Sequence, residues 1–83
     1  MSAEAMVWAL RAKVNSPAER LVLLMMGDNV NCDDVSTLMP ERLMEVCCLS
    51  PTELIATLES LQAGGHIERK PLCGWRLLIP EGF

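Results

Sequence analysis

Four cysteines and one histidine are the side chains of this sequence best suited to bind a metal or to act as nucleophiles: Cys32, Cys47, Cys48, Cys73 and His66. A zinc site needs pairs of ligands about one helical turn apart, as in Cys-x-x-Cys, whereas adjacent residues on a helix point about 100° apart. Cys47 and Cys48 are adjacent and His66 is the only histidine, so the spacing predicts no metal site. We expect four free thiols that serve as small buried apolar residues.

Catalysis needs a nucleophile beside a base, or two carboxylates that share a site. Cys73 and His66 would form such a pair only if the fold brought them together with an orienting carboxylate, and their spacing gives no reason for that. The sequence also lacks a glycine-rich phosphate loop. We therefore expect neither an enzyme nor a cofactor.

The size and charge of the chain restrict its class further. Its 83 residues, 51% of them apolar, predict a single domain over residues 1–83 with a modest core. Apolar runs such as Leu21 to Met26 are far shorter than the roughly 20 residues of a membrane span, and residues 1–15 do not resemble a secretory signal. We expect a soluble, cytoplasmic domain. Its formal net charge of -4 argues against nonspecific coating of nucleic acid.

An amphipathic helix is predicted over residues 1–15, with Ser2 as a candidate N-cap. Trp8 lies opposite the apolar stripe of this helix. We expect either that the end of the chain or the wing, a hairpin predicted below at residues 66–79, covers Trp8, or that Trp8 anchors a dimer or partner contact. The stripe consists of Ala3, Met6, Val7, Leu10 and Val14.

Two Ser-Pro-x-Glu sequences predict helix starts, because the serine can cap the helix, the glutamate can return the bond and proline suits the first turn. The first, at residues 16–19, opens a core helix over residues 16–29 that is apolar all round from Leu21 to Met26. The second, at residues 50–53, opens the last helix of a helix-turn-helix over residues 38–63. Pro40 suits the first turn of the preceding helix.

Helical periodicity divides the faces of these last two helices. The third helix is predicted to bury Met39, Leu43, Val46 and Cys47. The fourth is predicted to bury Leu54, Ile55, Leu58 and Leu61 and to leave Thr52, Glu53, Ala56, Glu59 and Ser60 outward, with Thr57 on the flank.

A hairpin is predicted at residues 66–79, after a left-handed cap at Gly64-Gly65. Its strands would run over residues 66–69 and 75–79, and Val35-Ser36-Thr37 is a candidate short strand. The fold class expected from this order is mainly α with a small β-hairpin. It is a winged helix-turn-helix of three to four helices and a two- or three-stranded wing.

Residues 16–24, residues 49–69 and the segment Trp8-Ala9-Leu10 together resemble winged helix-turn-helix domains of phage and plasmid replication proteins and small bacterial regulators. The resemblance implies a DNA-binding regulator of transcription or replication from a phage or other mobile element. Its partner would be double-stranded DNA, which the last helix enters through the major groove. The implied base-reading residues are Thr52, Thr57 and Ser60, and the implied phosphate-binding residues are Arg69, Lys70 and Arg76.

Members of that family usually place an arginine or lysine just after the cap of this helix. The fourth helix differs, because it begins Pro51-Thr52-Glu53 and carries no lysine or arginine. Phosphate binding depends on cations, so a helix with Glu53 and Glu59 would repel DNA. The alternative is a winged helix that binds a basic protein partner. Its contacts would be Trp8, Glu41, Glu45, Glu53 and Glu59. A structural or oligomer-forming module, such as a homodimer, is a third possibility, since the six methionines suit adaptable interfaces.

Overall fold

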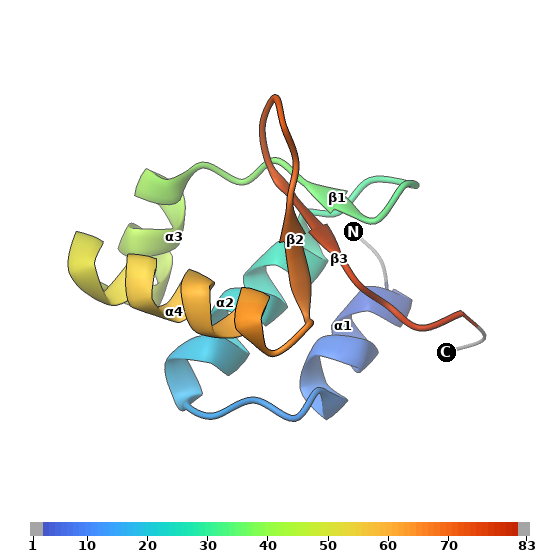
Figure 1. The fold of residues 1–83 in the computed structure, drawn as a ribbon, viewed down its shortest axis with the longest axis horizontal. Helices are drawn as coiled ribbons and strands as arrows, with labels where there is room; N and C mark the ends of the chain where they lie inside the picture. Colours follow the sequence, from blue (N-terminus) through green and yellow to red (C-terminus); the bar gives the residue numbers. More distant parts are fainter. Residues whose placement is uncertain (1–2, 82–83) are drawn as a thin grey trace.

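The computed structural model describes residues 3–81 and contains four helices and three short strands in that range (Figure 1). The candidate cap Ser2 lies outside the described residues. The elements, in chain order, are α1 (Ala3–Arg11), α2 (Pro17–Asp28), β1 (Val35–Ser36), α3 (Pro40–Cys47), α4 (Pro51–Ala63), β2 (Ile67–Arg69) and β3 (Trp75–Leu77). The expected class, mainly helical with a small sheet, is confirmed.

The three strands form an antiparallel sheet in the order β1-β3-β2. The predicted hairpin is therefore present, and the short strand at Val35–Ser36 joins it as a third strand. Gly74 sits between the hairpin turn and β3 with φ +84°, and a Cβ there would lie 2.5 Å from the carbonyl oxygen of Ser36. Only glycine allows β1 to approach this closely at the base of the turn.

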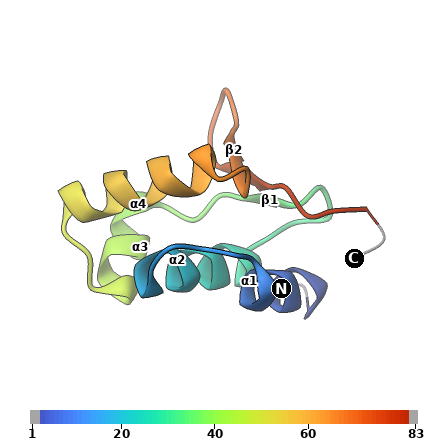
Figure 2. The same ribbon diagram turned by 60° about the horizontal axis from the view of Figure 1, so that its bottom comes forward.

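Helix α2 is central, as its apolar sequence predicts. It packs against α1, α3 and α4, and Val22, Leu23 and Met26 are completely or almost completely buried. The sheet closes the core with Ile67 and Leu77, which are register partners on β2 and β3. Figure 2 shows α1, α2 and α3 in one layer, α4 above them and the β2–β3 hairpin projecting beyond α4.

The predicted buried face of α1 is mostly wrong, because the helix buries Ala5, Trp8 and Ala9. Of the predicted stripe, Met6 and Val14 are only partly buried, with Val14 packed against the core, and the other three residues are exposed. Val7 and Leu10 are 40% and 58% exposed. The reason is the closeness of α1 and α2: a Cβ on Gly27 would lie 3.2 Å from the carbonyl oxygen of Ala5, so only small side chains fit between the helices.

Helix α1 also ends earlier than predicted, at Arg11 rather than near Val14. The Arg20 guanidinium donates hydrogen bonds to the carbonyl oxygens of Ala9 (2.8 Å) and Ala12 (2.6 Å). These bonds satisfy carbonyls that the end of the helix leaves without intrahelical partners. A side chain of α2 thus fixes the C-terminus of α1.

Trp8 is covered by its own chain, with 5% of its surface exposed. Its ring meets the His66 ring edge-on, with the centroids 6.5 Å apart, and His66 Nε2 lies 3.1 Å from the Lys13 carbonyl oxygen. The expectation that the chain itself covers Trp8 is therefore confirmed, and the alternative that Trp8 anchors a dimer or partner contact is not. The contact explains why the first helix and the start of the hairpin lie together.

The predicted faces of α3 and α4 are partly correct. Leu43, Cys47, Leu54 and Leu61 are buried as expected, and Val46 and Leu58 are partly buried. Two residues predicted to be buried are exposed instead. Met39 precedes α3 and is 61% exposed, and Ile55 is 59% exposed, because the buried stripe of α4 centres on Leu54 and Leu61 and Ile55 points about 100° away from it.

The cysteines are free thiols, as predicted, but Cys47 alone among them is buried. Burial, and to a lesser extent the neighbouring Cys48, raises the pKa of the Cys47 thiol. Cys48 follows α3 in the left-handed conformation, with φ 56°, and its N–H donates to the Met44 carbonyl. The expectation that all four serve as core residues is therefore wrong for Cys32, Cys48 and Cys73, which lie on turns or at a helix end.

Candidate functional site

A groove of about 390 Å³ lies between α4 and the wing, the β2–β3 hairpin of residues 66–79. Helix α4 contributes Ile55, Leu58 and Glu59 to it, and the hairpin contributes Arg69 and Trp75. A second hollow of about 270 Å³ adjoins it at Arg69 and Trp75 and continues between residues 37–40 and the hairpin turn. We call the two hollows together the α4–wing groove.

Trp75 and Arg69 form the hairpin wall of this groove. They are register partners on β3 and β2, and they share a sheet face with Ile67 and Leu77, because side chains alternate along a strand. The Arg69 guanidinium carbon lies 5.7 Å from the centre of the Trp75 ring, which is a cation–π contact. This wall is therefore apolar with one stacked positive charge.

The α4 wall is apolar with negative charge. Ile55 and Glu59 are exposed on it and Leu58 is partly buried. Glu53 is exposed in the first turn of α4, outside the groove, and its carboxylate accepts a hydrogen bond from the Ser50 N–H at 2.9 Å. The Ser50 backbone and side-chain hydrogen bonds lower the pKa of Glu53, so the carboxylate keeps its charge at neutral pH.

Two of the three predicted base-reading residues are engaged inside the protein. Thr57 is buried, and its hydroxyl donates to the Glu53 carbonyl oxygen at 2.7 Å. Ser60 is partly buried, and its hydroxyl donates to Glu19 Oε2 at 3.0 Å. The outward placement predicted for Ser60 is wrong, and Thr52 is the member of the set that stays exposed.

The predicted phosphate-binding residues do not share one surface. Arg69 and Lys70 line the α4–wing groove. Arg76 follows Trp75 on β3 and thus points to the other face of the sheet, where its register partner is Glu68. Its Nε is buried and has no hydrogen-bond partner among residues 3–81.

The residues predicted to contact a protein partner are also divided. Trp8 is removed from this set, because it is buried within the chain. Glu45 forms an ion pair with Arg42, with 2.6 Å between Oε1 and Nη1, on the exposed side of α3. Glu41, Glu53 and Glu59 are exposed, and Glu59 lines the groove.

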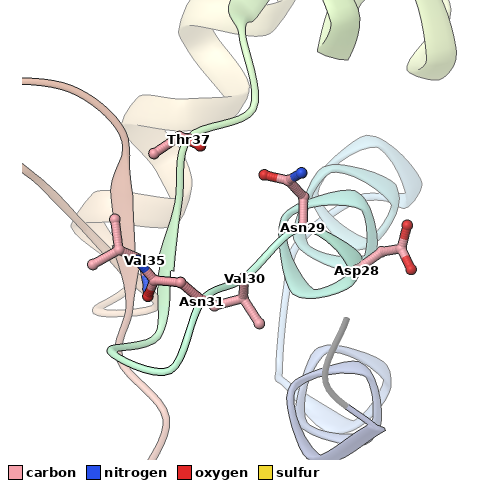
Figure 3. A pocket seen from close by; sticks show the side chains of 6 residues that line it. All are labelled: Asp28, Asn29, Val30, Asn31, Val35 and Thr37. Carbon is pink, nitrogen blue, oxygen red and sulfur yellow. The ribbon is translucent and has the colours of Figure 1, made fainter.

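A smaller hollow of about 230 Å³ follows the end of α2 (Figure 3). Its Asn31 Oδ1 already accepts hydrogen bonds from the Asp33 and Val35 N–H groups, at 2.8 and 3.0 Å. The Asp28 carboxylate points away from the other polar side chains of the hollow in Figure 3. Across the described part of the chain, no three His, Cys, Asp or Glu residues gather closely enough to hold a metal ion.

Sequence reasoning missed the apolar part of the α4–wing groove. Helical periodicity places Ile55 in the core, and the sequence pattern gives no binding role to Trp75 or to Leu72, which is 98% exposed at the hairpin turn. The available signal was the apolar Leu72 and Trp75 beside Arg69 and Lys70 in a hairpin that projects from the domain.

Comparison with protein-family models, with curated proteins and with solved structures gave no match. Within residues 3–81, no helix has both the length and the apolar character that a membrane span requires. The proposals below therefore rest on the geometry and charge of this chain.

Proposed function

We propose that the chain is a winged helix-turn-helix domain. Three residues, Cys48 to Ser50, join α3 to α4, and an antiparallel hairpin follows directly. The strand that precedes α3 completes the sheet in the order β1-β3-β2, and the hairpin projects past α4 (Figure 2). Short connections of this kind, with the second helix exposed beside a hairpin, are typical of that fold.

We propose further that the domain binds proteins through the α4–wing groove. The observation that carries this proposal is the groove-lining face of α4, which presents Ile55 and Glu59, while the whole helix has no cation from Pro51 to Ala63. DNA affinity comes largely from cations that displace counterions from phosphates, and α4 supplies none. A face with an exposed aliphatic residue above an apolar groove instead suits a protein anchor.

The residues that line the groove indicate the chemistry of the partner that it would accept. An aliphatic or aromatic side chain would insert between Leu58 and Trp75, since both line the cavity and are partly buried. A lysine or arginine beside that anchor would meet Glu59, which also lines the groove. The partner is therefore an amphipathic segment with cations flanking its apolar face, and the charges mainly accelerate the encounter.

A defined probe tests this proposal: a synthetic helical peptide of leucine and lysine, added to a Trp8→Phe protein in which Trp75 is the remaining tryptophan. We expect saturable binding that changes Trp75 fluorescence, and Ile55→Asp or Glu59→Lys should weaken it about tenfold. Glu68→Lys is the matched control, because it makes the same charge change on the other face of the sheet, and it should leave the affinity within about twofold. Equal binding by all variants, or no binding at about 1 mM peptide, would overturn the proposal.

DNA binding is the second candidate, favoured by the exposed Thr52 at the start of α4 and by Arg69 and Lys70 on the projecting hairpin. The test is titration of random and candidate operator duplexes at low salt. The protein-binding proposal predicts no complex, and Glu53→Lys with Glu59→Lys should create weak affinity by supplying cations. A complex formed by the unchanged protein and weakened by Arg69→Ala and Lys70→Ala would instead establish DNA as the ligand of this surface.

A further inference from the structure

The outward side of α1 is a second apolar surface, separate from the α4–wing groove. It consists of Ala3, Val7 and Leu10, which we call the α1 outer stripe. These residues are three and four positions apart, so they lie in one line along the helix. All three are exposed.

The packing of α1 within the chain does not account for this stripe. The helix turns its alanines inward, where Ala5 and Ala9 are fully buried, and its larger aliphatic side chains outward. The close approach at Gly27 requires small residues on the inner side, but it places no demand on the outer side. Exposed Val7 and Leu10 are unfavourable in water unless another surface covers them.

Charges of opposite sign stand at the two ends of the stripe. Glu4 is in the first turn of α1 and Arg11 is in the last turn. They are seven positions apart, which is almost two helical turns, so both side chains lie on the same edge of the stripe and about 10 Å apart. That distance is too great for an ion pair within one helix, and the structure records no such pair within residues 3–81.

We propose that the occupant of the α1 outer stripe is a second copy of this chain, packed with its α1 antiparallel to the first across a two-fold axis. Reversal of one helix brings Glu4 of each copy beside Arg11 of the other and places the two Val7 side chains near the axis. A parallel pairing would place the charges of the two copies on opposite edges of the contact, where neither glutamate meets an arginine. The stripe is thus complementary to itself in the antiparallel sense, as a two-fold interface requires.

The dimer formed in this way is weak. A nine-residue helix is about 14 Å long, so it buries much less than the roughly 800 Å² per partner of a stable interface. Figure 2 places α1 in the layer away from α4 and the projecting hairpin, so the dimer leaves both α4–wing grooves open. Self-association through α1 is therefore independent of the proposed protein binding.

Sedimentation equilibrium over a range of protein concentrations tests the dimer. We expect the mass to rise toward twice that of one chain at high concentration, and Val7→Asp or Leu10→Asp should abolish this rise. Ile55→Asp is the matched control, since it adds the same charge at an equally exposed residue of the groove, and it should leave the dimer intact. A monomer at every concentration up to about 1 mM would overturn the proposal.

Charge exchange tests the antiparallel arrangement. Glu4→Arg alone and Arg11→Glu alone should each weaken dimerisation about fivefold, whereas the double variant should restore it to within about twofold. Thermal unfolding of each variant separates this effect from damage to α1, because both changes also oppose the helix dipole. A double variant that dimerises less than either single one, with the helix intact, would overturn the arrangement. Loss of the dimer in Ile55→Asp would place the second copy in the groove instead.

Discussion

Helices α2 and α4 begin with the same four-residue pattern, Ser-Pro-x-Glu, and their first turns are alike. Ser16 Oγ accepts a hydrogen bond from the Glu19 N–H at 3.2 Å, and Ser50 Oγ accepts one from the Glu53 N–H at 3.1 Å. Proline follows the serine in both helices. The pattern therefore has the same local effect at both places, because serine and proline act on neighbouring backbone groups.

The two glutamates have different roles. Glu53 is exposed and closes the capping box on the Ser50 N–H. Glu19 is 5% exposed, and its carboxylate accepts hydrogen bonds from the Asn15 N–H at 3.3 Å and from the Ser60 hydroxyl at 3.0 Å. One carboxylate thus serves its own helix, and the other joins α2 to α4. The surroundings, not the pattern, decide between these roles.

The largest expected effect comes from removing the buried carboxylate. Glu19→Ala should lower the free energy of unfolding by about 2 kcal/mol, because the Ser60 hydroxyl and the Asn15 N–H lose their acceptor in a partly buried place. Urea denaturation measures this loss. Glu53→Ala should cost clearly less, since water can replace the exposed carboxylate. Equal losses for the two variants would show that the buried bonds contribute nothing beyond a local cap.

A double-mutant cycle separates the bond between α2 and α4 from the cap. Glu19→Ala and Ser60→Ala should be coupled by about 1 kcal/mol, because each removes the same hydrogen bond. No hydrogen bond or ion pair joins Glu53 to Ser60, so Glu53→Ala and Ser60→Ala are expected to be additive within about 0.5 kcal/mol. The urea midpoints of the single and double variants give both values. Additivity in the first cycle would contradict the structural role assigned to Glu19.

A smaller effect is expected at the capping serines. Ser16→Ala and Ser50→Ala should each cost about 1 kcal/mol in the free energy of unfolding, since each removes one bond to the first turn. We expect the two losses to agree within about 0.5 kcal/mol despite the difference in burial of the glutamates. Thr52→Ala is the control, because Thr52 is exposed and does not cap the helix. A much larger loss at one serine would mean that the two starts are not equivalent.

The parts of the fold that depend on neighbouring residues could be predicted from the sequence. The serines and prolines mark the starts of α2 and α4, Pro40 marks α3, and two strand-like segments after the Gly64-Gly65 cap predict the hairpin. Each signal acts within a few residues, so the rest of the structure cannot readily change it.

The faces of the helices and the site could be predicted only in part, because they depend on which surfaces meet. The stripe of α1 is apolar by spacing, yet the small Ala5 and Gly27 control its packing, so Val7 and Leu10 turn outward. Ile55 looks like a core residue, but no element covers its side of α4. Ser60 is predicted to face outward on α4, but it turns inward because its hydroxyl donates a hydrogen bond to Glu19, which is 41 positions away in the sequence. No local pattern contains such contacts.

The smallest effect, and the one that most directly separates the two helix starts, is the pH dependence of the α4 cap. Hydrogen bonds from the Ser50 backbone and side chain hold the pKa of Glu53 below its ordinary value. The ionised carboxylate therefore contributes stability above the pKa of glutamate in the unfolded chain. This contribution is lost as the pH falls through the lower pKa of the folded state.

Glu53→Gln removes this titration and keeps the size of the side chain. The difference in urea midpoint between the unchanged protein and Glu53→Gln should be constant above about pH 5 and should shrink as the pH falls below about 4. The same comparison in a Ser50→Ala background is the control, because the bond from the serine side chain to the carboxylate is then absent and the dependence should be weaker. A difference that stays constant down to acid pH would mean that the Glu53 carboxylate does not stabilise the start of α4 through its charge, and the local role assigned to it would then be wrong.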